Sequence, residues 1–250
     1  MRYFLEIEYK GSSFNGWQMQ KDALSVQQCI QECMSTILRE EVIIYGAGRT
    51  DSGVHARQMF AHTDIEQSIS PVLLHRINRF LPPDVVIHRT IEVDGKAHAR
   101  FDASLREYMY RVHLQKSPLQ NGLSYYYPYP LTDFEAMQEA SEFLKDCKDF
   151  TILSRKNPDQ RNSFCQIFDT RWETKNDGKE LVFYISANRF LRGMVRRVVG
   201  VLLTIGRGTL SVDDFQHAMR TNSPLPVNDK APADGLYLNR IAYPFLKKEA

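Results

Sequence analysis

The sequence has few of the features that would place the protein in a narrow class. Its 250 residues contain four cysteines, and none of them forms a Cys-x-x-Cys pair. We therefore expect no disulfide framework and a reducing compartment. No apolar run approaches the length of a membrane span, and the N-terminus begins a strand pattern, not a signal peptide. These absences predict a soluble, cytoplasmic protein.

Strong net charge is also lacking, because 32 lysines and arginines nearly balance 30 acids to give +2. The net charge therefore does not indicate a polyanionic partner, but the distribution of charge along the chain is more informative. Residues 185–210 contain no acid and include Arg189, Arg192, Arg196, Arg197 and Arg207. A local basic surface fits a partner that docks at one face. A solvated helix face explains the same run equally well.

Hydrophobic patterns predict one order of elements in the first part of the chain and its repetition in the second. Alternation and helical spacing, with a capping box at Ser25 and Gln28 and a proline at the first helical position, predict the first six elements. These are strands at 2–9, 42–47, 58–64 and 85–93, and helices after Ser25 and from Ser70-Pro71. The order β-α-β-β-α-β is that of the ferredoxin-like unit.

The second part shows the same order with one added helix. Its predicted elements are strands at 106–114, 163–173, 181–187 and 236–243, a helix capped by Thr132 and Glu135, a helix over 190–204 and a helix from Ser211. We place the boundary near residue 104, which gives halves 1–104 and 105–250. The fold class predicted from these patterns is α+β.

The most informative segment is residues 46–57, Gly-Ala-Gly-Arg-Thr-Asp-Ser-Gly-Val-His-Ala-Arg. Here Arg49, His55 and Arg57 put hydrogen-bond donors and positive charge beside one acid, Asp51. An isolated Asp-Ser-Gly is usually an Asx turn between strands. A carboxylate can also act as a covalent nucleophile, and loops held by a rigid sheet often carry catalytic groups.

This segment resembles the signature Gly-Arg-Thr-Asp-(Ala/Ser)-Gly-Val-His of the tRNA pseudouridine synthase A family. Four further blocks match that family in the right order. They are Glu8 to Gln20 continued by 25–27, His98 to Tyr110, Phe190 to Gly200, and Gly235 to Leu238 followed by Tyr243-Pro244. Together the five blocks span nearly the whole chain, so the resemblance is specific.

The resemblance implies two tandem ferredoxin-like halves. Their sheets would join edge to edge into one mixed, mostly antiparallel sheet, with helices on one face and a catalytic cleft at the seam. It also implies a homodimeric isomerase that converts uridine to pseudouridine at positions 38, 39 and 40 of the tRNA anticodon stem-loop. The reaction moves the glycosidic bond from N1 to C5 without redox change or net hydrolysis. We therefore expect no cofactor.

The resemblance assigns three catalytic residues. Asp51 is the nucleophile, and the sequence leaves open whether it attacks ribose C1′ or base C6. Arg196 forms an ion pair with Asp51, and a charged donor of this kind keeps a sheltered carboxylate ionised and oriented. Tyr108 stacks on the target uracil and helps to remove the C5 proton. From its strand pattern alone, Tyr108 is equally a core aromatic with a wet hydroxyl group.

We also expect a set of RNA contacts from the residues themselves, although chance repetition explains the paired His-Ala-Arg triplets as well. Arg49 occupies the gap left by the extruded uridine, since base extrusion costs a few kcal/mol. His55, Arg57, Arg100 and Arg189 line the RNA path, and the His-Ala-Arg triplets at 55–57 and 98–100 contact phosphates. A metal site built on His55, His62 and Asp64 is rejected, because their spacing fits no strong zinc pattern.

The sequence departs from the family pattern at two places. Glu107 stands where the family usually has a basic residue, and Arg192-Gly193 stands where a histidine often precedes Met-Val-Arg. Both departures change the charge beside the inferred RNA path and therefore bear on substrate breadth. Three alternatives stay open: a synthase acting on another RNA, a catalytically silent RNA-binding module, and an acid-based hydrolase, which would need a second carboxylate.

Overall fold

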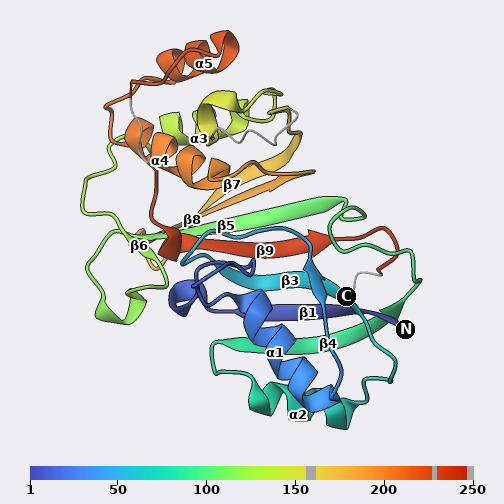
Figure 1. Cartoon of the computed structure of the whole chain (residues 1–250). Helices are drawn as coiled ribbons and strands as arrows, with labels where there is room; N and C mark the ends of the chain where they lie inside the picture. The colour runs from blue at the N-terminus through green and yellow to red at the C-terminus, as the bar shows by residue number, and fades with distance from the viewer. Residues whose placement is uncertain (156–161, 227–229, 247–250) are drawn as a thin grey trace. The chain divides into compact units, whose positions relative to one another are not determined.

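The computed structural model describes residues 1–155, 162–226 and 230–246 (Figure 1). Over these residues the protein is an α+β molecule with strands β1 to β9, helices α1 to α5 and short 3-10 turns. It divides into two compact units. The first is Met1–Ser104 together with the C-terminal segment that begins at Tyr237, and the second is Leu105–Leu236.

The first unit is a mostly antiparallel sheet in the order β4-β1-β3-β9, with β2 paired to β3. Strand β9 runs parallel to β3 through the pairs His55↔Tyr237 and Ala56↔Leu238. The elements of this unit are β1 (Arg2–Tyr9), α1 (Val26–Leu38), β2 (Ile44–Gly46), β3 (His55–Asp64), α2 (Pro71–Phe80), β4 (Val85–Val93) and β9 (Leu236–Ala242).

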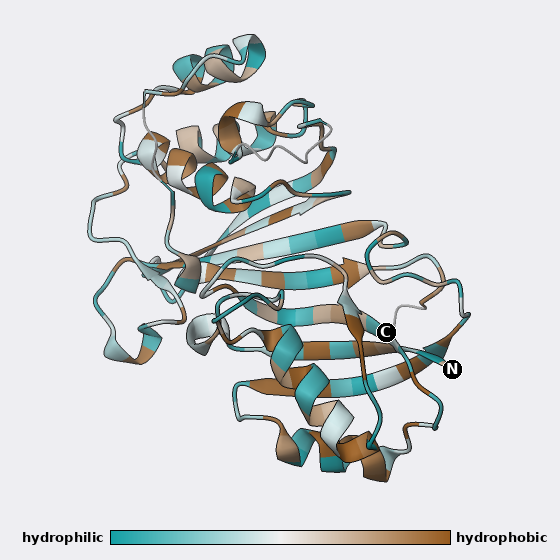
Figure 2. Ribbon diagram, viewed as in Figure 1, coloured by the Kyte–Doolittle hydropathy of each residue, from teal (hydrophilic) through white to brown (hydrophobic). Residues whose placement is uncertain are grey.

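Strand β1 lies at the centre of this sheet and is buried on both faces. Tyr3, Leu5 and Ile7 are buried on one face, and Phe4 packs edge-on against Tyr243 on the other, at 5.1 Å between ring centroids. Helices α1 and α2 lie beside one another and contact β2 and β4 (Figure 1). Figure 2 shows hydrophobic and hydrophilic bands alternating along the strands, as half-buried strands require.

The predicted helix starts of the first unit are confirmed. The Ser25 hydroxyl group accepts a hydrogen bond from the Gln28 amide at 3.2 Å. The Ser70 hydroxyl group accepts one from the Leu73 amide at 3.2 Å, with Pro71 as the first helical residue. Each cap satisfies a backbone donor that has no partner within the helix.

The second unit contains an antiparallel sheet in the order β7-β8-β5, with the short strand β6 parallel to β5. Helix α4 is its most buried helix, because its apolar residues Val198, Val199 and Leu202 face the core. The elements are β5 (Leu105–His113), β6 (Tyr125–Tyr126), α3 (Phe134–Phe143), β7 (Ile167–Lys175), β8 (Glu180–Ala187), α4 (Met194–Gly206) and α5 (Val212–Thr221).

Two predicted helix starts in this unit are wrong. Helix α3 is capped by Asp133 and not by Thr132, because the Asp133 carboxylate accepts from the Ala136 amide at 2.8 Å. Helix α4 begins at Met194 and not near residue 190, because Gly193 has a φ of +69° and breaks the helical path. The predicted cap of α5 is confirmed, since the Ser211 hydroxyl group accepts from the Asp214 amide at 3.0 Å.

The last strand lies with the first unit, whereas the sequence pattern counted it with the half 105–250. Besides its pairing with β3, the C-terminal segment bonds to the end of the first 104 residues. The Ser104 amide donates to the Ala242 carbonyl at 2.9 Å, and the Tyr243 hydroxyl group donates to the Ala99 carbonyl at 2.6 Å. The second unit is therefore inserted, in sequence, before the last strand of the first.

Candidate active-site loop and RNA-contacting residues

Asp51 lies in the loop that connects β2 to β3 and is partly exposed. The loop makes a tight turn at this point, because the Val54 amide donates to the Asp51 carbonyl at 3.2 Å. Gly53 has a φ of +79°, which L-residues with side chains rarely adopt. The turn therefore presents the Asp51 side chain from a fixed backbone.

The N-terminal residues 9–17 hold this loop from one side. The Trp17 amide donates to the Thr50 carbonyl at 3.3 Å, and the Gly53 amide donates to the Phe14 carbonyl at 3.3 Å. At Gly16, a Cβ atom would stand 2.3 Å from the Thr50 carbonyl oxygen, so only glycine allows this approach. The first sequence block and the Asp51 block are therefore parts of one local structure.

The structure gives His55 a bracing position and corrects its predicted contact with RNA. Its side chain is buried, with 1% of the residue exposed. Its Nδ1 accepts a hydrogen bond from the Gly11 amide at 3.1 Å, and its ring stacks on Tyr237 at 4.5 Å between centroids and an interplanar angle of 20°. The imidazole is thus enclosed by the first unit and is not exposed at the surface.

The arginines predicted to contact RNA in this unit are exposed. Arg49 precedes Asp51 in the loop, and Arg57 lies near the start of β3. Arg100 is also exposed, and its guanidinium carbon lies 5.7 Å from the centre of the Phe101 ring. Exposed guanidinium groups are suited to phosphate contacts, which position a nucleic acid without reading its sequence.

Tyr108 and Tyr110 lie on one face of β5 in the second unit, and the structure separates their roles. Tyr108 is partly exposed and meets the Phe190 ring edge-on at 5.0 Å and 88°. Tyr110 is fully buried, its hydroxyl group donates to the Pro232 carbonyl at 2.8 Å, and burial raises its pKa. Tyr108 is therefore the tyrosine of this pair that retains an accessible ring.

Arg196 lies in the first turn of α4 and is partly exposed. Its Nε donates to the Ala231 carbonyl at 2.7 Å, and the Ala231 amide donates back to the Arg196 carbonyl at 3.0 Å. Its charge also acts to lower the pKa of Tyr110, which places the two side chains in one neighbourhood. Arg189, by contrast, is exposed and precedes the helix.

Glu107, the first departure from the family pattern, has a charged neighbour that sequence reasoning missed. Arg171 on β7 approaches its carboxylate at 3.6 Å. The pKa of Arg171 is raised mainly by Glu107, against the opposing effect of its own burial. Glu107 shares this cationic neighbour with Asp169 and Glu173, each of which lies 3.3 Å from Arg171. No sequence pattern links two residues on β5 and β7, since the strand β8 lies between them.

Two of the residues considered for a metal site, His62 and Asp64, have other partners. His62 is buried, accepts a hydrogen bond at Nδ1 from the Ala99 amide at 3.2 Å, and has its pKa lowered to about 4 by burial. Asp64 forms an ion pair with Arg2 at 2.6 Å. In the described part of the chain, no three His, Cys, Asp or Glu side chains are grouped to hold a metal.

No helix in this part is both long and apolar enough to cross a membrane.

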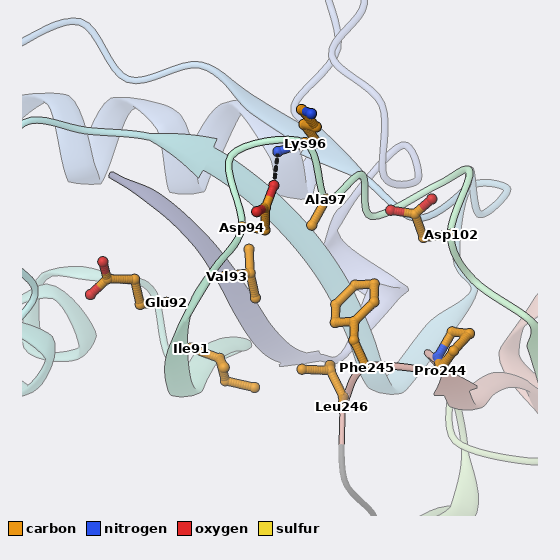
Figure 3. Close-up of a pocket in the computed structure, with 10 residues that line it drawn as sticks. All are labelled: Ile91, Glu92, Val93, Asp94, Lys96, Ala97, Asp102, Pro244, Phe245 and Leu246. Carbon is orange, nitrogen blue, oxygen red and sulfur yellow. Dashed lines mark hydrogen bonds between the residues drawn. The ribbon is translucent and has the colours of Figure 1, made fainter.

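One surface hollow of the first unit is separate from these residues. It has a volume of about 670 Å³ and is formed by the end of β4, the loop after it and the C-terminal segment. Figure 3 shows the side chains of Ile91, Phe245 and Leu246 along it, with Asp94 bonded to the Lys96 amide at its rim. None of the predicted site residues lines it.

Comparison with known proteins gives matches over nearly the whole chain. A family model described as tRNA pseudouridine synthase matches residues 147–244. A Porphyromonas gingivalis protein named tRNA pseudouridine synthase A is 42% identical over 97% of this chain and 97% of its own. Proteins of that name from Parabacteroides distasonis and Bacteroides thetaiotaomicron are also 42% identical, over 97% of this chain and 96% and 91% of theirs.

One solved structure shows a weak similarity. A chain from a structure of an H/ACA RNP bound to a substrate RNA containing 2′-deoxyuridine matches with a TM-score of 0.31 and 10% identity. The match covers 80% of this chain and 52% of that one. Values this low carry no argument about fold or function.

Proposed function

Since this chain belongs to the tRNA pseudouridine synthase A family, we propose that it isomerises uridine to pseudouridine in the anticodon stem-loop of tRNA, at positions 38, 39 and 40. The observation that carries the proposal is the braced loop around Asp51, which holds the signature sequence within a chain 42% identical to its relatives. We further propose that the protein acts as a homodimer. Sedimentation of the purified protein measures this directly.

The proposed fold consists of two tandem ferredoxin-like halves. In the first unit, the strand order β4-β1-β3 with β2 on β3, together with helices α1 and α2, supports this assignment. In the second unit, the antiparallel order β7-β8-β5 with helices α3 and α4 supports it. The addition of β9 to the first unit extends the simple repeat.

We propose that Asp51 is the nucleophile. In one route, a carboxylate oxygen bonds to ribose C1′ while the electrons of the C1′–N1 bond leave on the uracil. The uracil then turns, C5 bonds to C1′, and the ester electrons return to the carboxylate. C5 finally loses its proton and N1 gains one, so that the composition of the nucleotide is unchanged. In the second route, the carboxylate adds to base C6 before the glycosidic bond moves.

Tyr108 and Arg196 support this chemistry in the proposal. The accessible Tyr108 ring stacks on the extruded uracil, a contact typically worth about 1–3 kcal/mol per base. Its hydroxyl group helps to remove the C5 proton. Arg196 pairs with the Asp51 carboxylate and keeps it ionised. The hydrogen bond from Arg196 Nε to the Ala231 carbonyl, at 2.7 Å, supports this role because it orients the guanidinium group.

The experiment that tests the function replaces Asp51. We expect Asp51→Asn and Asp51→Ala to release no tritium from tRNA that carries 5-tritiated uridine, because the carboxylate forms the covalent intermediate. Affinity for tRNA in filter binding should stay within several-fold, since phosphate contacts dominate it. Glu66→Gln, at an exposed acid of the same unit, is the matched control and should turn over normally.

Three outcomes separate the alternatives. Substantial turnover by either Asp51 variant removes the nucleophile assignment. Tight tRNA binding with no turnover by the unaltered protein on any tRNA identifies a silent RNA-binding module. Pseudouridine mapping in RNA from cells with and without the protein identifies a synthase that acts on another RNA.

A further inference from the structure

The loop that carries Asp51 is fixed at its preceding residue by two separate hydrogen bonds. The Thr50 carbonyl accepts from the Trp17 amide at 3.3 Å. The Thr50 hydroxyl group shares a hydrogen bond with the Tyr9 hydroxyl group, at 2.8 Å between Oγ1 and Oη. Backbone and side chain of the residue before Asp51 are therefore both tied to the N-terminal segment.

The two hydroxyl groups are enclosed by the first unit. Tyr9 is 2% exposed and Thr50 is 9% exposed. A buried hydroxyl group that loses its partner costs about 1–3 kcal/mol. Tyr9 is the last residue of β1 and is held by pairing with β3 and β4 on either side. The Tyr9 side chain thus extends to the loop from a strand that is paired on both sides.

Both ends of the loop are held to the same segment. At the far end, the Gly11 amide donates to His55 Nδ1, and a Cβ atom at Gly11 would stand 2.0 Å from the Val54 carbonyl oxygen. Between these anchors lie Asp51, Ser52 and Gly53. A nucleophile on so short a span has little freedom to shift along the path toward its substrate.

We infer that Tyr9 is a positioning residue for Asp51, which it holds through the hydroxyl group of Thr50. The inference rests on the proposed nucleophilic role of Asp51. Reacting groups must be held within about 0.5 Å of productive geometry, and a misplacement of about 1 Å can reduce a rate about 100-fold. The Tyr9–Thr50 pair is a side-chain contact that fixes the residue next to the carboxylate.

The test is the single-turnover rate at saturating tRNA for Tyr9→Phe, which removes only the hydroxyl oxygen. We expect a fall of about tenfold or more, with unchanged tRNA affinity in filter binding. The matched control is Tyr243→Phe. Tyr243 is equally buried in the same unit, and its hydroxyl group donates to the Ala99 carbonyl at 2.6 Å, away from the loop. The control should lower the unfolding midpoint comparably and leave the rate unchanged.

Substitutions at Thr50 test the same contact from the other side. Thr50→Ser keeps the hydroxyl group and should keep most of the rate, whereas Thr50→Val should lose as much as Tyr9→Phe. The double variant Tyr9→Phe/Thr50→Val should be no slower than either single variant, because one contact is lost in all three. The Thr50 pair also decides the matter if Tyr9→Phe does not fold.

The outcomes distinguish this inference from the proposed function. A Tyr9→Phe rate equal to that of Tyr243→Phe, or equal rates for Thr50→Ser and Thr50→Val, overturns the inference alone, provided that the Asp51 variants are inactive. Turnover by Asp51→Ala overturns the nucleophile assignment, and the positioning inference falls with it.

Discussion

Arg196 and Arg197 are neighbours in the chain, but helix α4 separates their directions by about 100°. Arg196 Nε is anchored on the Ala231 carbonyl, and its charge reaches Tyr110. If Arg196 pairs with Asp51 as proposed, Arg196→Met should lose turnover while Arg197→Met stays nearly normal. Tritium release and thermal unfolding measure the two effects separately. Equal loss of turnover in both variants would indicate a general basic patch.

His62 makes folding stability depend on pH in a defined window. Burial lowers its pKa from the ordinary 6.5 to about 4. Between those values the unfolded chain binds a proton that the folded chain does not, so the free energy of unfolding falls as pH falls from about 6.5 to 4. The full difference of about 2.5 pKa units corresponds to about 3 kcal/mol. Burial also lowers the pKa of the neighbouring His98, and this adds to the pH dependence.

We therefore expect His62→Gln to flatten the curve of unfolding free energy against pH between about pH 6.5 and 4, whatever its effect on the absolute value. Urea unfolding at several pH values measures the slope. His75→Gln, on the exposed side of α2, controls for loss of a histidine. A His62→Gln curve parallel to that of the unaltered protein would contradict the assignment.

The sequence indicated which segment carries the candidate chemistry but not which of its side chains are enclosed. Asp51, Arg49 and Arg57 have the exposure that their predicted roles need. His55 stands in the same motif, yet it is buried by Gly11 and Tyr237, which are distant in the sequence. Burial of this kind is decided by tertiary packing, which no local pattern contains.

At the scale of the elements, the cap of α3 gives a direct test of the corrected helix start. The Asp133 carboxylate accepts a hydrogen bond from the Ala136 amide and caps the helix. Thr132 lies one residue before this cap, and its amide donates to the Gly206 carbonyl. We expect Asp133→Ala to lower the free energy of unfolding by about 1 kcal/mol. Thr132→Ala should have a smaller effect. Chemical denaturation of both variants measures the difference, and the reverse order would restore the predicted cap.

Most elements were predictable because their apolar spacing is regular. Strands β1 and β4 begin and end within a residue of their predicted bounds, and helix α1 begins at the predicted residue. Boundaries failed where a local backbone conformation competes with the pattern. Apolar residues continue from Phe190 into α4, but Gly193 adopts a left-handed φ that stops the helix there. Strand β6 has two residues and is too short for alternation to be detected.

For the whole molecule, the net charge of +2 says little about RNA affinity. If Arg57, Arg100 and Arg189 contact phosphates, tRNA affinity should fall steeply with salt. In a plot of log affinity against log salt concentration, each contact should add about 0.7–0.9 to the steepness of the slope. Each Arg→Ala change at these positions should lower the slope by about one contact and leave the rate at saturating tRNA unchanged. Filter binding across a salt series measures the slopes.

Arg49 is expected to behave differently from this set. Its proposed role is to hold the place of an extruded base, which costs a few kcal/mol to remove from the stack. Arg49→Ala should therefore lower the single-turnover rate even at saturating tRNA, in a quench-flow comparison with Arg57→Ala. A normal saturated rate with weaker binding would make Arg49 another phosphate contact.

The return of the last strand to the first unit has a consequence for synthesis on the ribosome. The partner of His55 in β9, Tyr237, is made only after the inserted second unit. At 5–20 residues per second, the roughly 130 intervening residues take about 7 to 26 s. During that time β3 has an open edge and the His55 ring lacks the aromatic ring on which it stacks. Nascent chains that stop before β9 therefore cannot complete the support of the Asp51 loop.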